Sequence, residues 1–154
     1  MTVVTWLQLV DMARNWNFMS ESFLLSNIAP QVGSGFNRHI WKSLELAVRG
    51  LVEQRGTHWS HFAVKENLIT YKVIGDNHVA VPTNFYKIVV DANNRDKLEA
   101  LAFILPNKDL SGHHYTEFLT TIDEIEVTTG LDFLSDLPAA IQHEVESQKA
   151  TSIW

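Results

Sequence analysis

The amino-acid sequence predicts an α+β fold with a mainly antiparallel sheet, and three observations support this prediction. Residues 38–54 carry apolar side chains at helical spacing. Runs between residues 68 and 91 are rich in β-branched and aromatic residues and are separated by turn residues. The regular alternation of strands and helices that is typical of a parallel sheet is not found here. With 154 residues, of which 45% are hydrophobic, the chain suits one compact domain.

A short strand and a loop are expected first. The segment from Phe18 to Ala29 predicts a turn that leads into an apolar strand. Pro30 would stop this strand, because proline has no amide hydrogen for a sheet ladder. The Gly33–Gly35 region then predicts a loop.

The main helix is expected over residues 38–54. Asn37 suits its N-cap, and Gly56 would end it. Its expected buried face consists of Ile40, Leu44, Ala47, Val48 and Leu51.

Four strands are expected after the helix. Their ranges are 68–74, 78–81, 85–91 and 99–106. Turn residues at Gly75–Asn77 and Pro82–Asn84 separate the first three, and residues 91–98 predict a solvated hairpin loop before the last. Further on, Thr121 would cap a short helix over residues 122–129 that Gly130 ends. The closing segment, residues 139–154, is a polar tail that is expected to be helical, frayed or both.

Composition limits the classes of site. The formal net charge of −6 excludes a broad basic surface as the source of affinity for nucleic acid. The chain has no cysteine, so any metal must be held by oxygen or imidazole. No run reaches the roughly 18 apolar residues of a membrane helix, and the first residues lack the pattern of a secretory signal. As written, the chain is therefore expected in the cytoplasm.

Polar and aromatic side chains recur every four residues along the expected helix, at Asn37, Trp41, Glu45 and Arg49. They would form one row beside the apolar stripe. Oxygens of Asn37 and Glu45 would suit Mg²⁺ and its bound waters, and Arg49 could face a phosphate oxygen. The same spacing fits an N-cap at Asn37, a core-edge Trp41 and an ordinary Glu45–Arg49 helix pair.

Several strings occur in a fixed order: SESFLLSNIAPQ, FNRHIW, LELAVRG, YKVIGDNHVAVPTNFYKIVV, AFILPN and EIEVTTGLDFLSDLP. In this order the chain resembles the DNA/RNA non-specific endonuclease family, which includes the endonuclease G-like enzymes, over residues 11–138. The resemblance implies a ββα-metal fold with a long metal-finger helix. It also implies a sugar-non-specific endonuclease that hydrolyses phosphodiester bonds of DNA and RNA with Mg²⁺ or Mn²⁺.

The resemblance also implies roles for individual residues. Asn37 would be the direct metal ligand. Glu45 would contact a metal-bound water and Arg49 a phosphate, and these two would act with Asn27 in catalysis. Such contacts to DNA and RNA run through phosphate and carry no base readout. A homodimer is compatible with this assignment.

The chain departs from the family pattern at its start. Family members carry DRGH, usually extended to DRGHLAPAAD, shortly before SESF, and the histidine of this motif is the general base. Here the chain begins MTVVTWLQLVDM, without that motif. Reading the codons from the third base of the Met1 codon permits DRGHLAPA. We therefore expect residues 1–10 to be an out-of-frame remnant and the nuclease domain, residues 11–138, to be N-terminally truncated.

A second departure follows the helix, where the family has a strand that ends in TGP and this chain has THWSHFAV. A one-base shift through His58–Phe62 permits TGPI. Both shifts predict a finger without one strand and a corrupted central strand. The chain as written would then be inactive or nearly so, because a general base contributes about 10²–10⁴-fold. The alternative is a non-catalytic remnant that binds nucleic acid or a protein partner, or a pseudogene product. An intact parent could be secreted or periplasmic.

Other candidate residues have simpler interpretations. No histidine occupies the position of the family base, and those considered are His39, His58, His61, His78, His113 and His114. Trp16 and Trp41 are expected to pack rather than to stack on bases. The acidic run Asp123, Glu124 and Glu126 is expected to supply favourable charge to the first turn of a helix.

Overall fold

The structure is a computed structural model, and it describes residues 2–5, 28–55, 58–61, 72–91 and 98–154. Asn27, Gly56 and Trp16 lie outside these residues, as do most of the expected first strand and the expected hairpin loop. The described elements combine antiparallel sheets with helices, which confirms the predicted α+β class.

The central sheet has four antiparallel strands in the order β3-β6-β7-β8. Their bounds are His58–His61 for β3, Asn84–Asp91 for β6, Glu99–Pro106 for β7 and Leu119–Thr120 for β8. β6 and β7 pair along their full length, from Asn84 opposite Pro106 to Asp91 opposite Glu99. The backbone of β3, where a corrupted strand was expected, pairs in antiparallel fashion with β6.

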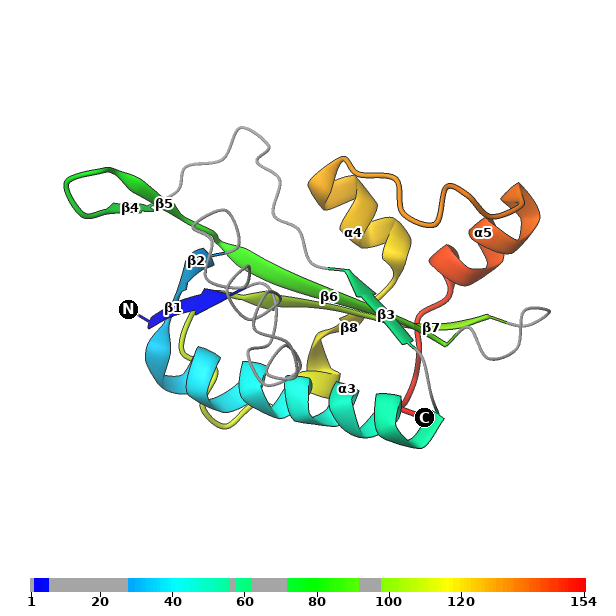
Figure 1. Ribbon diagram of the computed structural model, residues 1–154, viewed down its shortest axis with the longest axis horizontal. Coiled ribbons are helices and arrows are strands. Elements are labelled where there is room, and N and C mark those ends of the chain that lie inside the picture. The colour runs from blue at the N-terminus through cyan, green and yellow to red at the C-terminus, as the bar shows by residue number, and fades with distance from the viewer. Residues whose placement is uncertain (1, 6–27, 56–57, 62–71, 92–97) are drawn as a thin grey trace, which may run out of the picture.

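Helices cover both faces of this sheet (Figure 1). Helix α3, Lys42–Arg55, lies on one face, and α4, Ile122–Thr129, with α5, Ala139–Ser147, lies on the other. Alternate residues of β6 point to opposite faces, so this strand contributes to two cores. The core under α3 includes Leu44, Val48, Phe85, Val89, Leu101 and Phe103. The core under α4 and α5 includes Tyr86, Ile88, Val90, Ile122, Ile125 and Val145.

The main helix has the predicted buried face but starts differently. Ile40, Leu44, Val48 and Leu51 are buried, as predicted, whereas Ala47 is only half-buried. A segment with π-helical hydrogen bonds, η2, spans Gly33–Trp41 and precedes α3, and Ser34 and Gly35 within it are not helical. The helical backbone therefore begins directly after Gly35 and Asn37 lies inside it, so the prediction of Asn37 as N-cap is wrong. The Asn37 N–H donates instead to the Val32 carbonyl at 2.9 Å, a π-type bond to the residue five positions earlier.

A two-stranded sheet precedes this helix. β1, Thr2–Thr5, pairs in antiparallel fashion with β2, Ile28–Gln31, with Thr2 opposite Gln31. Pro30 lies inside β2 rather than after it, which corrects the prediction that it stops the strand. Proline is tolerated in strands that leave one edge unpaired. β1 consists of four of the residues that were expected to be an out-of-frame remnant.

The β4–β5 hairpin extends away from the central sheet (Figure 1). β4 is Lys72–Ile74 and β5 is Val79–Val81. The turn between them has positive φ at Gly75, +71°, and at His78, +50°. This confirms the predicted turn, the strand predicted over residues 78–81 and the described part, residues 72–74, of the strand predicted over 68–74.

The C-terminal third follows its local signals. Thr121 caps α4 by accepting a hydrogen bond from the Glu124 N–H at 3.1 Å, and Gly130 ends the helix with φ of +67°, both as predicted. A short 3-10 helix, η3, spans Tyr115–Phe118. The closing segment is more than a polar tail, because α5 buries Val145 and the residues after α5 pack against the core under α3. Among the described residues, no helix is long and apolar enough to span a membrane.

Candidate metal and phosphate site

The junction between β2 and η2 determines where Asn37 lies. Ser34 is extended, and Gly35 has φ of +73°, which is the left-handed conformation that glycine adopts most readily. A Cβ atom at Gly35 would collide with the carboxylate of Asp109. The predicted loop is therefore a kinked turn that leads directly into π-helical backbone.

Gln31 holds the side chain of Asn37. Asn37 Nδ2 donates a hydrogen bond of 3.0 Å to Gln31 Oε1, and Gln31 itself is only 1% exposed. Because this bond uses the nitrogen of the amide, it directs the carbonyl oxygen Oδ1 of Asn37 away from Gln31. Asn37 is half-buried, so this oxygen belongs to a side chain that solvent can reach. A neutral oxygen with a fixed direction suits a hard divalent cation such as Mg²⁺ or Mn²⁺.

Glu45 and Arg49 follow on the same helix and are both half-buried. Eight residues, or about two helical turns, separate Asn37 from Glu45. Helical side chains tilt toward the N-terminus, so Glu45 can approach an ion at Asn37 through a bound water.

Trp41, the remaining member of the row, is part of the core. It is 3% exposed, and its ring centroid lies 5.7 Å from those of both Phe36 and Phe85. The Lys87 ammonium lies 5.7 Å from the Trp41 ring centroid. The expected packing role of Trp41 is confirmed.

Three of the four predicted site residues lie in the part of the chain that the structure describes. Asn37, Glu45 and Arg49 share one helix, whereas Asn27 lies outside the described residues. β1, where the shifted codon reading predicts the DRGH motif, runs beside β2.

Sequence reasoning missed two residues of this site, Gln31 and Asn107. Asn107 donates through Nδ2 to the carbonyls of Pro30 and Pro82, and its Oδ1 accepts from the Val32 N–H. Both residues lie inside strings quoted for the family resemblance, SNIAPQ and AFILPN. Polar side chains at the ends of apolar strands were the signal that could have identified them.

Two residues of the acidic run near α4, Asp123 and Glu124, lie in the first turn of the helix, as expected. The Thr120 hydroxyl donates to the Glu124 carboxylate at 3.1 Å. Asp123 and Glu126 also lie with Glu146 of α5, each offering an oxygen within 4.8 Å of the others. Burial raises the pKa of Glu146, and the charges of Glu126 and Asp123 raise it further. This cluster is on the face of the sheet opposite α3, so it is separate from Asn37.

His113 and His114 both contact Glu117 of η3. His113 Nδ1 lies 2.9 Å from the Glu117 carboxylate, and this contact lowers the pKa of Glu117. His114 is the N-cap of η3, and its backbone N–H donates to Glu117 at 2.7 Å. His39 is exposed on η2. For His58 and His61 the structure describes the backbone and not the side chains.

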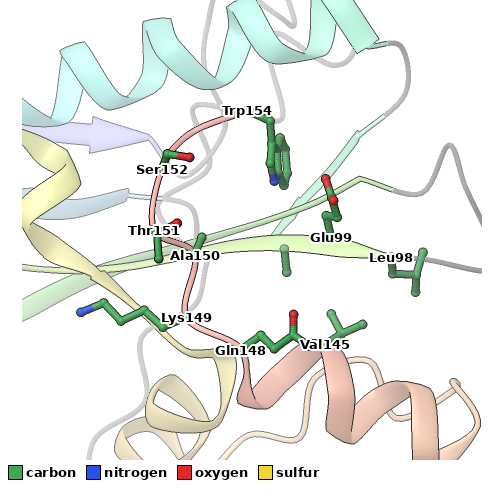
Figure 2. Close-up of a pocket in the computed structure, with 10 residues that line it drawn as sticks. Leu98, Glu99, Val145, Gln148, Lys149, Ala150, Thr151, Ser152 and Trp154 are labelled. Atoms are coloured by element: carbon green, nitrogen blue, oxygen red, sulfur yellow. The ribbon is translucent and has the colours of Figure 1, made fainter.

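A pocket of about 220 Å³ lies at the start of β7, at the end of this strand that is far from Asn107 (Figure 2). It is lined by the first residues of β7, the end of α5 and the C-terminal segment, including Glu99, Lys149 and Trp154. Asn107 follows the last residue of β7 and Glu99 is its first, so the length of a strand separates this pocket from the Asn37 site. None of the predicted site residues lines it.

Known proteins are similar in sequence to this chain over most of its length. The family described as DNA/RNA non-specific endonuclease matches residues 10–140. The chain is 37% identical to the mitochondrial nuclease of Saccharomyces cerevisiae, over 78% of this chain and 42% of that protein. It is 33% identical to the mitochondrial endonuclease G of Caenorhabditis elegans, over 88% of this chain and 48% of that protein. The chain thus spans less than half the length of these two relatives.

A solved structure has the same fold. The chain superposes with a TM-score of 0.77 and 30% identity on a chain from "Crystal structure of the EndoG/EndoGI complex: Mechanism of EndoG inhibition", covering 89% of this chain and 60% of that one. This similarity confirms the expected ββα-metal fold. Since the family match covers most of its length, the chain belongs to the DNA/RNA non-specific endonuclease family.

Proposed function

We propose that this chain carries the metal-binding and phosphate-binding part of a nuclease that hydrolyses phosphodiester bonds of DNA and RNA with Mg²⁺ or Mn²⁺. The orientation of Asn37 is the observation that carries the proposal. Its amide nitrogen is bound to Gln31, which leaves Oδ1 to act as a ligand. Membership of the family supplies the type of reaction.

Each residue of the row has a distinct task in this proposal. Asn37 would hold the ion through Oδ1, Glu45 would hold a water bound to it, and Arg49 would bind a phosphate oxygen of the substrate. When bound, the ion would supply Lewis-acid stabilisation of the charge that develops on the scissile phosphate. The Arg49 guanidinium stays protonated and can form two parallel hydrogen bonds to phosphate. Asn27 joins them by family resemblance. The proposed contacts are to phosphate and not to the 2′-hydroxyl that distinguishes RNA from DNA, so the proposal includes both as substrates.

The general base is the part that this sequence does not supply, because it has no DRGH string. The shifted codon reading places the aspartate, arginine, glycine and histidine of that motif at Thr2, Val3, Val4 and Thr5. These are the four residues of β1, and Thr5 pairs with Ile28 of β2. The backbone strand that would carry the base is therefore available for its restoration.

The test replaces residues 2–9 with DRGHLAPA and measures cleavage of plasmid DNA and of RNA in Mg²⁺. The restored chain should cleave about 10²–10⁴-fold faster than the chain as written, since that is the usual contribution of a general base. A matched control carries DRGALAPA, which differs only at the histidine, and should stay at the slow rate. A second control, Asn37→Ala on the restored chain, should lose cleavage together with metal binding.

The result also decides between catalysis and binding. A folded restored chain that cuts no faster than its DRGALAPA control would overturn the catalytic proposal. Binding to nucleic acid that weakens with salt, without cleavage, would then identify a non-catalytic binding domain.

A further inference from the structure

Asn107 connects two distant parts of the chain through its side chain. Its Oδ1 accepts a hydrogen bond from the Val32 N–H at 2.8 Å. Its Nδ2 donates to the carbonyl of Pro30 at 3.1 Å and to the carbonyl of Pro82 at 2.9 Å. Both amide hydrogens and the carbonyl oxygen are therefore in use. The side chain fastens the end of β2 to the turn between β5 and β6.

The two β2 contacts lie on either side of Gln31. Pro30 precedes Gln31 and Val32 follows it, so one side chain restrains the backbone of Gln31 from both directions. The backbone N–H of Asn107 also donates to the Thr83 carbonyl at 2.8 Å, which anchors Asn107 itself. The anchor is rigid because β6 and β7 pair along their full length just beyond it.

Gln31 passes this restraint to Asn37. Its side chain is 1% exposed, and its Oε1 accepts the hydrogen bond from Asn37 Nδ2 at 3.0 Å. A shift of the β2 end would move this acceptor and release the Asn37 amide to rotate. Partners of this kind, one step behind a metal ligand, fix its orientation.

We propose that Asn107 is a positioning residue for the metal site, which acts through Gln31 to fix the direction in which Asn37 presents Oδ1. The inference rests on the proposed function of Asn37 as a metal ligand. The hydrogen bonds themselves need no ion, so the positioning can be measured in the metal-free chain.

The experiment measures two properties of the full chain and its variants. The first is the NMR signal of the Asn37 side-chain amide without metal, assigned by its loss in Asn37→Asp. The second is the dissociation constant of Mn²⁺ from electron paramagnetic resonance. Asn107→Ala and Gln31→Met should each shift the Asn37 signal and weaken Mn²⁺ binding, by about 10–100-fold for loss of such a partner. The double variant should be no weaker than Gln31→Met alone, because both changes act through one bond.

Two controls separate positioning from general stability. Asn84 is an asparagine whose exposed amide donates to the neighbouring Thr83 hydroxyl at 3.1 Å, so Asn84→Ala should leave both properties unchanged. Ile122→Val removes a methyl group from the core on the opposite face, and should lower the melting temperature without changing either property. If Asn107→Ala does not fold, Asn107→Asp keeps the acceptor for Val32, removes the two donors and takes its place.

Each outcome decides the proposal. A folded Asn107 variant with the Asn37 signal and the Mn²⁺ affinity of the parent chain would overturn it. If the parent chain binds no Mn²⁺, the proposed function of Asn37 is wrong, and the amide signal alone then shows whether Asn107 positions Asn37.

Discussion

Gly35 starts the helix that carries the candidate site, and Gly35→Ala should be costly for two separate reasons. Its φ of +73° is left-handed, which costs a non-glycine residue about 1–2 kcal/mol. The added Cβ would also collide with the Asp109 carboxylate. Hydrogen bonds from Ser111 hold that carboxylate in place and lower its pKa. Asp109 is exposed, so its carboxylate can move aside, but only by giving up its hydrogen bond from the Ser111 N–H. The expected loss of unfolding free energy is therefore the backbone cost of about 1–2 kcal/mol together with the loss of this contact.

Two other glycines separate these costs. Gly75 has φ of +71°, but nothing lies within 4 Å of a Cβ built there, so Gly75→Ala should show the backbone cost alone. Gly50 lies in α3 with no such φ and with nothing within 4 Å. Gly50→Ala should therefore stabilise the chain by about 0.5–1 kcal/mol, because alanine loses less backbone freedom on folding.

Urea unfolding and differential scanning calorimetry of the three variants provide the assay. For a chain of this size, each kcal/mol corresponds to about 2–4 °C in melting temperature, so the backbone cost alone should lower the melting temperature of Gly35→Ala by roughly 2–8 °C. Equal losses for Gly35→Ala and Gly75→Ala would refute the collision with Asp109. If Gly50→Ala destabilised the chain, the open space around a Cβ atom at each glycine would not predict the effect of these substitutions.

Three further substitutions test individual contacts. Glu146→Gln removes a carboxyl whose pKa lies above its ordinary value of 4.5. Because the folded chain binds this proton more tightly than the unfolded chain, protonation of Glu146 contributes to the free energy of unfolding. This contribution is full below a pH of about 4.5 and is lost as the pH rises through the raised pKa. Urea midpoints from about pH 4 to pH 7 should therefore fall more in the parent chain than in Glu146→Gln, and parallel curves would contradict the assignment. Thr121→Ala removes the acceptor for the Glu124 N–H and should cost about 1 kcal/mol in urea unfolding, whereas an unchanged midpoint would mean that the cap is unimportant. Trp41→Ala should cost about 3–5 kcal/mol because the side chain is buried, and at temperatures where the variant is folded its affinity for single-stranded DNA should equal that of the parent. A selective loss of that affinity would indicate base stacking instead.

Local signals were sufficient for the regular elements and for part of the site. The Thr121 cap and the Gly130 end of α4 depend on residues within one helix, and both were predicted correctly. The apolar stripe of α3 was predicted from its period alone. The helical row Asn37, Glu45 and Arg49 was likewise selected by spacing, and the ordered strings pointed to the family.

The start of the helix shows where local reasoning failed. Asn37 has a residue type and a place in the sequence that favour an N-cap, yet it lies within η2 and bonds back to Val32. The difference arises at Gly35, whose left-handed backbone allows the chain to turn earlier, against Asp109. That contact joins residues far apart in the sequence, so no local pattern around Asn37 contains it.

The sequence by itself determined the fold class, the buried stripe of the main helix and the family, because periodicity, caps and ordered motifs depend on neighbours along the chain. Only the tertiary structure decided that Asn107 fastens β2, that Gln31 holds Asn37, and that Glu146 joins the carboxylates of α4. Each of these contacts depends on the packing of segments against one another. Amide and carboxyl side chains occur throughout the sequence, and only packing determines which of them meet.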